Sequence, residues 1–261
     1  MSGEAELTEH AAINRERWDE LSDSYQDRHG GQLRESGGSA WGVWQLPESE
    51  LQVLGEVAGL DVLEFGCGAA QWSIALHRRG ARVTGLDNSA RQLEHARRLM
   101  HEAGVEFPLV HASAEATGLG EESFDVIFCD FGAMTFTDPQ LSVPEAARLL
   151  RPGGLFAFSA ITPICDLTWG DDDEHPGERL VRNYFEEMHR IETPGEPINF
   201  QLGYGEWVAV FGRSGLVIET LIELRPGPDA VSSYRTEEDR EWARRWPLEH
   251  VWRLRKQTPS R

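Results

Sequence analysis

Two glycines that follow a short apolar run give the clearest chemical signal in the sequence. Gly66 and Gly68 come directly after the run 62–65, and a stretch typical of a helix begins just beyond them. Glycine lets the backbone turn tightly and approach a ligand closely, and the first turn of a helix presents unpaired N–H groups. We therefore expect the loop around Cys67 to hold a polar ligand.

A carboxylate further along the chain indicates what kind of ligand this is. Asp87 ends a second apolar stretch, Gly85-Leu86-Asp87, about twenty residues after the glycine loop. A carboxylate at the end of that strand can accept hydrogen bonds from both hydroxyls of a ribose. The loop and Asp87 together predict a site for a nucleoside-containing ligand.

The same two features would suit a nicotinamide dinucleotide, so the details of the loop matter. A dinucleotide fingerprint has Gly or Ala at its third position, where this chain has Gln71. Glu64, just before the loop, suits a ligand that bears an ammonium group and lacks a pyrophosphate. These residues favour a ligand other than NAD. An NAD-dependent oxidoreductase and a glycine turn that binds nothing remain open as alternatives.

Expected strands and helices alternate around these residues, which is typical of parallel βαβ units. The strands cover 61–65, 82–86, 107–111, 124–129 and 155–159, with helices between them at 70–79, 89–102 and 139–150. Towards the end of the chain we expect a helix at 206–213, a strand at 216–224, a helix at 237–245 and a strand at 250–255. Further helices are expected at 9–25, 48–57 and 178–190.

Five blocks of the sequence, taken in order, resemble the class I S-adenosylmethionine-dependent methyltransferases, in particular bacterial enzymes that act on small molecules. The blocks are Glu64-Phe65-Gly66-Cys67-Gly68, Asp87, Ala112-Ser113-Ala114-Glu115, Phe124-Asp125-Val126-Ile127-Phe128 and Leu149-Leu150-Arg151-Pro152-Gly153-Gly154. The resemblance covers about 47–159. It implies an α/β fold with a doubly wound, mostly parallel, seven-stranded Rossmann-like sheet. It also implies transfer of a methyl group from S-adenosylmethionine, which leaves S-adenosylhomocysteine, to an O, N or C nucleophile of a small molecule.

The resemblance further implies which residues contact the cofactor. The backbone of 66–68 would hold the methionine part, Asp87 the ribose and Asn88 the adenine, while Cys129 and Asp130 would lie beside the reactive methyl. Many relatives carry Asp where this chain has Ser113, so a side-chain bond to the adenine amino group does not carry over. The full set of cofactor-binding candidates is Tyr25, Trp44, Glu64, Gly66, Cys67, Gly68, Gln71, Asp87, Asn88, Gln92, Ser113, Ala114, Glu115, Cys129 and Asp130.

Two segments flank the predicted cofactor-binding core at 47–160, and residues 201–261 supply the rest of the sheet. Residues 1–46 form an expected N-terminal arm, which contains the aromatic residues Trp18, Tyr25, Trp41 and Trp44. Such rings can hold a sulfonium cation, cover a flat substrate, or simply pack the arm on the sheet. The insertion at 161–200 is too long for an ordinary connection, so we expect a substrate lid there.

Methyl transfer depends mainly on positioning and desolvation of the reactants, so a dedicated base is not required. Where the acceptor must lose a proton, the candidates for the base are His29, Asp130 and His175. No metal site is expected. The three cysteines form no CxxC pair, and the acidic run 171–174 is typical of a solvated loop.

The amino-acid composition limits the kinds of molecule that the protein is expected to bind. Acidic residues outnumber basic ones 44 to 25, for a net charge of −19, and such a surface repels a phosphate backbone. No apolar run reaches the ~18 residues that a membrane span needs, and the start of the chain has no signal-peptide pattern. We expect a cytoplasmic monomer or homodimer that binds neither nucleic acid nor membrane. A protein that binds S-adenosylmethionine without catalysis is the main alternative.

Overall fold

A seven-stranded sheet forms the centre of the computed structural model, which describes residues 7–35, 37–170, 174–186 and 189–258. The strand order is β10-β11-β7-β6-β3-β4-β5. Neighbours are parallel except β11, which is antiparallel to both β7 and β10. The strands are β3 (Asp61–Phe65), β4 (Arg82–Asp87), β5 (Leu109–His111), β6 (Phe124–Asp130), β7 (Leu150–Ile161), β10 (Leu216–Leu224) and β11 (Glu249–Lys256). The doubly wound, mostly parallel α/β sheet is thereby confirmed.

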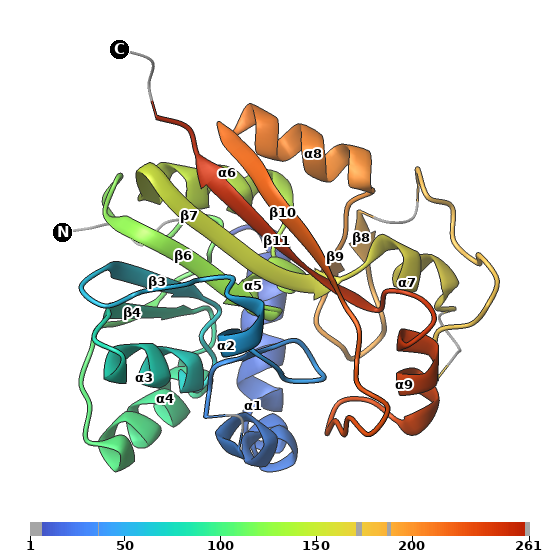
Figure 1. Ribbon diagram of the computed structural model, residues 1–261, viewed down its shortest axis with the longest axis horizontal. Helices are drawn as coiled ribbons and strands as arrows, with labels where there is room; N and C mark the ends of the chain where they lie inside the picture. Colours follow the sequence, from blue (N-terminus) through green and yellow to red (C-terminus); the bar gives the residue numbers. More distant parts are fainter. Residues whose placement is uncertain (1–6, 36, 171–173, 187–188, 259–261) are drawn as a thin grey trace.

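Helices cover both faces of this sheet (Figure 1). On one face lie α3 (Gln71–Arg78) and α4 (Ala90–Ala103), and on the other lie α6 (Pro139–Leu149) and α8 (Tyr204–Arg213). Side chains along each strand alternate between the two resulting cores. In β6, for example, Phe128 packs on the α3 side and Ile127 on the α8 side. Burial on both faces explains why these strands appear in the sequence as continuous apolar runs.

The N-terminal helix is longer than the sequence predicts. Helix α1 spans Glu9–Glu35, whereas the periodic pattern predicted an end at Tyr25. The pattern fades because polar residues such as Gln26 and His29 occupy the buried side of the last turns. Helix α1 is held to the start of α4 by Asp19, whose carboxylate accepts the Ser89 hydroxyl at 2.6 Å and the Arg91 N–H at 3.1 Å.

The second predicted helix is shorter than expected. After a hairpin of β1 (Ala40–Trp41) and β2 (Leu46–Pro47), helix α2 covers only Glu48–Leu51 instead of 48–57. Gln52 takes a left-handed conformation with φ 52°. The Glu48 carboxylate then accepts the backbone N–H groups of Val53, Leu54 and Gly55. These bonds replace the ones that a continuing helix would have made.

The insertion contains little regular structure in its described part. The helix predicted at 178–190 is wrong, because residues 178–186 and 189 form bends and turns and the short strand β8 (Arg190–Ile191) follows. Its apolar residues Leu180 and Phe185 are exposed, so no core stabilises a helix there. Of the acidic run, 171–173 lie outside the described residues. Short elements absent from the sequence prediction are α5 (Gly132–Phe136), α7 (Pro163–Thr168) and β9 (Asn199–Phe200), while α9 (Glu237–Ala243) was expected.

Candidate functional site

A cavity of about 810 Å³ opens at the carboxyl ends of β3, β4, β6 and β7. The chain winds outwards from β3 to β4 and β5, then returns to the other side of β3 as β6. Ligands of open α/β sheets bind at this reversal, outside the carboxyl ends of the strands. The glycine loop and Asp87 both line the cavity, as does Asp130.

The glycine loop has a conformation that only glycine adopts easily. Gly66 has φ 69° and Gly68 has φ 52°. A Cβ atom on Gly66 would lie 2.3 Å from the backbone nitrogen of Ala133, so helix α5 can approach only because this position has no side chain. On Gly68 the nearest atom would be the Gln92 Oε1 at 3.7 Å. The first glycine is therefore needed for packing and the second mainly for its backbone angle.

Asp87 joins the loop to the second strand. Its Oδ2 accepts the Gly68 N–H at 2.8 Å, and its Oδ1 accepts the Ser89 N–H at 2.8 Å. Burial raises the pKa of Asp87 to about 6, against the lowering effect of these N–H donors. The carboxylate has further lone pairs and borders the cavity, so it can accept donors from a ligand.

Two further acidic side chains lie in the same region. Glu64 is 5% exposed, and its Oε2 accepts the N–H and the hydroxyl of Ser73 at 3.0 and 2.5 Å. Burial raises the pKa of Glu64 to about 8. Asp130 accepts the Gly42 N–H at 2.9 Å and the Ser159 hydroxyl at 2.5 Å, and burial raises its pKa too. A cationic ligand in the cavity would favour the ionised form of each group.

The structure brings most of the predicted residues to one cavity. The predicted cofactor-binding residues that line it are Tyr25, Glu64, Gly66, Cys67, Gly68, Gln71, Asp87, Asn88, Gln92, Ala114 and Asp130. The other four do not line it. Trp44 packs with Cys165 and Trp242 in a separate core, and the Cys129 Sγ accepts the Met134 N–H on the α8 side of the sheet.

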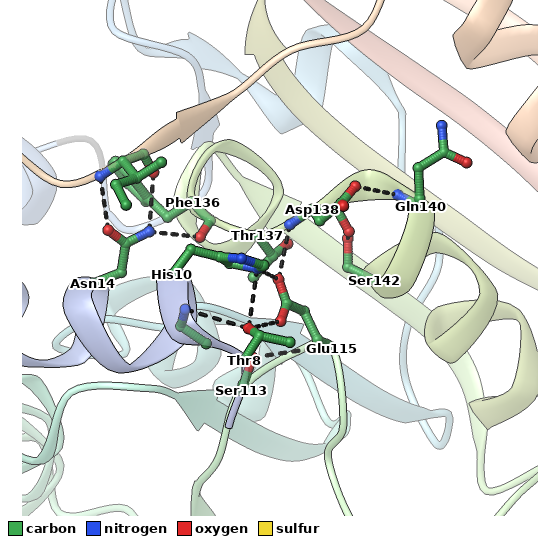
Figure 2. Close-up of polar contacts among 12 residues, drawn as sticks. Thr8, His10, Asn14, Ser113, Glu115, Phe136, Thr137, Asp138, Gln140 and Ser142 are labelled. Carbon is green, nitrogen blue, oxygen red and sulfur yellow. Dashed lines mark hydrogen bonds and ion pairs between the residues drawn. The ribbon is translucent and has the colours of Figure 1, made fainter. Parts of the chain in front are cut away.

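Ser113 and Glu115 also lie outside the lining, and each has an internal partner. The Ser113 hydroxyl accepts the Glu115 N–H at 3.2 Å. The Glu115 carboxylate accepts the Thr8 hydroxyl at 2.6 Å and the Asp138 N–H at 2.8 Å, and contacts the His10 Nε2 at 2.5 Å (Figure 2). Glu115 therefore holds the start of the arm against the core.

Neither candidate histidine lines the cavity. His29 stacks on the ring of Tyr234 at 3.9 Å, and its Nδ1 lies 2.9 Å from the Ser233 hydroxyl. His175 lies beside α9, with its Nδ1 3.0 Å from the Asp239 carboxylate. Among the described residues, the titratable groups on the cavity wall are carboxylates, tyrosines, arginines and a cysteine.

Asn14 ties the arm to both the core and the insertion. Its amide donates to the backbone oxygens of Phe136 at 2.8 Å and Ile198 at 2.9 Å, and its Oδ1 accepts the Ile198 N–H at 2.7 Å (Figure 2). Asn14 is 2% exposed and still borders the cavity. This buried side chain therefore joins the arm to the insertion beside the cavity, where the ring of His10 also packs on Phe200.

Asn14→Ala is expected to lower the free energy of unfolding by about 2–4 kcal/mol, because three buried backbone groups lose their partner at ~1–3 kcal/mol each before water compensates. Urea unfolding measures this change. Glu20→Ala, an exposed substitution on the same helix, is the matched control and should stay within about 0.5 kcal/mol of the wild type. Equal effects of the two substitutions would contradict a tie through Asn14.

Sequence reasoning missed the residues on the far wall of the cavity. They are Asp166 in α7, Trp169 and Arg182 in irregular stretches of the insertion, Gln201 directly after β9, and Arg235 in the loop before α9. Periodicity carries no signal for such segments, and no motif marked them.

Comparison with known proteins gives matches over the central part of the chain. Residues 63–158 match the family model described as a methyltransferase domain. Ubiquinone biosynthesis O-methyltransferase of Aromatoleum aromaticum is 40% identical over 108 residues, 40% of this chain and 45% of the relative. The enzyme of the same name from Stutzerimonas stutzeri is 34% identical over 133 residues, 45% of this chain and 57% of the relative. The chain spans about half the length of the curated relatives that it matches.

Solved structures match over more of the chain. An S-adenosylmethionine-dependent methyltransferase from Mesorhizobium loti is 25% identical, covering 79% of this chain and 95% of its own, with a TM-score of 0.64. The 1,6-didemethyltoxoflavin-N1-methyltransferase of Burkholderia thailandensis, solved with S-adenosylhomocysteine, is 16% identical and covers 97% and 93%, with a TM-score of 0.57. At that identity the second likeness shows the fold alone.

The described residues contain neither a cluster that could bind a metal nor a helix that could span a membrane. No group of three or more His, Cys, Asp or Glu side chains there is arranged to hold a metal ion. Within the same residues, every helix is too short or too polar to cross a bilayer. Cys67, Cys129 and Cys165 are buried and unbridged.

Proposed function

Because residues 63–158 form a methyltransferase domain of the class I S-adenosylmethionine-dependent family, we propose that the protein transfers a methyl group from S-adenosylmethionine to a small-molecule acceptor. The observation that carries this proposal is the meeting of the glycine loop, Asp87 and Asn88 at one cavity. The alternative of binding without catalysis leaves unexplained why the cavity continues to a second wall from the insertion.

The residues present fit this cofactor. The backbone of 66–68 would hold its methionine part, Asp87 would accept the ribose hydroxyls, and Ala114 would border the adenine. The sulfonium and ammonium groups of the cofactor would favour the ionised forms of Glu64 and Asp130, which would then hold these cationic groups. When bound, the cofactor supplies the methyl group and its own leaving group.

The rest of the cavity would position the acceptor and exclude water. Trp18, Phe136 and Phe200 supply aromatic walls from the arm, α5 and the insertion, and Asn14 keeps these three segments together. The main task of such an enzyme is to confine the acceptor and to hold its nucleophile in line with the methyl group. Where a hydroxyl acceptor must lose its proton, Asp130, Asp166 and Glu196 are candidate bases on the wall outside the glycine loop.

The test is turnover with a labelled cofactor. The protein is incubated with S-adenosylmethionine carrying a deuterated methyl group and a panel of small phenols, amines and acids, and the products are analysed by mass spectrometry. We expect one or more products with the labelled methyl group. Cofactor binding without any labelled product would instead favour the non-catalytic alternative.

Cofactor affinity is expected to rise with pH through about 6. The ribose hydroxyls would donate to Asp87, whose pKa is raised to about 6 in the free protein. Binding favours the ionised carboxylate and releases a proton, so affinity falls below this pH, while Glu64, with its pKa of about 8, would add a separate rise above pH 7. Calorimetry with S-adenosylhomocysteine from pH 5 to 7.5 measures the profile. Asp87→Asn should remove the step near pH 6; a step that persists in this variant would place the titrating group elsewhere.

The remaining expectations about this protein are also proposals. Residues 1–46 and 161–200 would act as a cap and a lid around the core at 47–160, completed by 201–261, which is consistent with the Asn14 contacts. The charge of −19 supports an acceptor other than nucleic acid. The buried, unbridged thiols support a reducing compartment such as the cytoplasm. We also propose that the protein is a monomer or a homodimer.

A further inference from the structure

Arg235, on the far wall of the cavity, has an unusual environment. The Arg235 guanidinium lies over the ring of Trp169, with its central carbon 4.6 Å from the ring centroid. Its Nε is buried, yet has no hydrogen-bond partner among the described residues. Both Arg235 and Trp169 line the cavity. A buried donor on a charged group costs free energy unless something accepts from it.

Nearby carboxylates do not supply that acceptor. Arg235 acts on Asp166 and on Glu249 through its charge, without a hydrogen bond to either. The Asp166 Oδ2 instead accepts the Gln201 amide at 2.8 Å, and the Glu249 Oε2 accepts the Val43 N–H at 2.9 Å. The guanidinium therefore has the capacity to hold a further anion.

A second arginine adds positive charge to the same wall. The Arg182 Nε donates to the backbone oxygens of Asp166 at 3.2 Å and Trp169 at 3.1 Å, which fixes this side chain beside α7. Both Arg182 and Arg235 favour the ionised form of Asp166 by their charge. The two arginines line the cavity together with apolar surface from Phe131 and Ile161.

The two ends of the cavity thus differ in the charged groups that they carry. Glu64 and Asp87 lie at the glycine loop, where a cationic cofactor would bind, whereas the wall built by α7 and the segments after it carries Arg182 and Arg235 together with Asp166 and Glu196. A guanidinium presents a planar fork of donors that matches a carboxylate. The aromatic surface around it suits a flat apolar body rather than a strongly hydrated one.

Building on the proposed function, we propose that the methyl acceptor is a small organic acid whose carboxylate is held by Arg235 over Trp169. The acid's apolar body would lie along the aromatic wall, and its nucleophile would face the cofactor. Arg235 would act as a specificity-determining residue, since an acceptor without the negative charge would leave its guanidinium unpaired.

Matched ligands test this inference without knowledge of the natural acceptor. The probes are 3,4-dihydroxybenzoate and 3,4-dihydroxybenzamide, which share the ring and hydroxyls and differ in charge. Their affinities are measured by calorimetry in the presence of saturating S-adenosylhomocysteine. We expect the acid to bind roughly 10- to 100-fold more tightly than the amide, the range for losing charge-assisted hydrogen bonds.

Variants assign this preference to one side chain. Arg235→Gln should bring the two affinities to within about threefold, Arg235→Lys should keep part of the preference, and Arg225→Gln, at an exposed arginine outside the cavity lining, should leave it unchanged. The inference is overturned by an amide that binds as well as the acid, by the failure of both probes to bind, or by a preference that survives in Arg235→Gln.

The affinity for S-adenosylhomocysteine distinguishes a failure of this inference from a failure of the proposed function on which it rests. Arg235→Gln should bind S-adenosylhomocysteine within about twofold of the wild type, which also shows that it folds. A large loss of that affinity would mean that Arg235 holds the cofactor's own carboxylate, which contradicts an acceptor site. If the wild type binds no S-adenosylhomocysteine, the proposed function itself fails, whatever the probes do.

Discussion

Asp87→Ala is expected to weaken the binding of S-adenosylhomocysteine by about 2–4 kcal/mol, which is roughly 30- to 700-fold. The variant loses the acceptor for the ribose hydroxyls. It also loses the carboxylate that accepts the Gly68 and Ser89 N–H groups, so the glycine loop is no longer tied to β4. Calorimetry measures the affinity, and circular dichroism checks that the sheet is intact.

Asp87→Asn is the matched control for this prediction. It retains one oxygen acceptor in the same position and removes the charge, so its affinity should lie between those of the wild type and Asp87→Ala. A folded Asp87→Ala variant with wild-type affinity would show that the ribose does not lie at this carboxylate.

Gly66→Ala is expected to abolish measurable cofactor binding, with a loss of more than 100-fold. The added Cβ would lie 2.3 Å from the Ala133 nitrogen, and the residue would also keep φ 69°, a region that side chains rarely adopt. The loop or helix α5 must therefore move, and both line the cavity. The melting temperature should fall as well, because α5 packs against the sheet here.

Gly68→Ala is the control that separates backbone strain from displacement of the loop or of α5. Gly68 has a similar left-handed angle, φ 52°, but a Cβ atom there would meet no atom closer than 3.7 Å. It should cost only the strain, about 1 kcal/mol, with a correspondingly small loss of affinity. Similar affinities for the two variants would contradict the steric explanation for Gly66.

The parts of the fold that could be predicted are those where burial repeats along the chain. Strand β3 was predicted with the bounds that the structure has, and β4 and β6 each extend one residue further, to Asp87 and Asp130. The central residues of these strands are largely buried, so each strand contains a short apolar run, interrupted by polar residues such as Glu64 and Asp125. The glycine loop and Asp87 could be identified because parallel strands bring their carboxyl ends to one edge.

The parts that could not be predicted are those where individual side-chain contacts, rather than periodicity, decide the local structure. Helix α2 stops early because the carboxylate of its own first residue, Glu48, binds the N–H groups of 53–55, and the apolar pattern does not signal this. Trp44, in an aromatic run, packs away from the cavity, whereas Asn14, in an ordinary helix turn, joins three segments above it. Arg235 was missed because its loop has no periodicity and its contact with Trp169 spans distant parts of the sequence.

Calorimetric titration of the wild-type protein with S-adenosylhomocysteine and, separately, with NAD distinguishes a methyltransferase cofactor site from a dinucleotide site. Both ligands contain a ribose that Asp87 could hold, but they differ at the glycine loop, where Gln71 and Glu64 disfavour a pyrophosphate. We expect saturable binding of S-adenosylhomocysteine at one site per chain and no heat of binding with NAD. Binding of NAD with no response to S-adenosylhomocysteine would contradict a methyltransferase cofactor site.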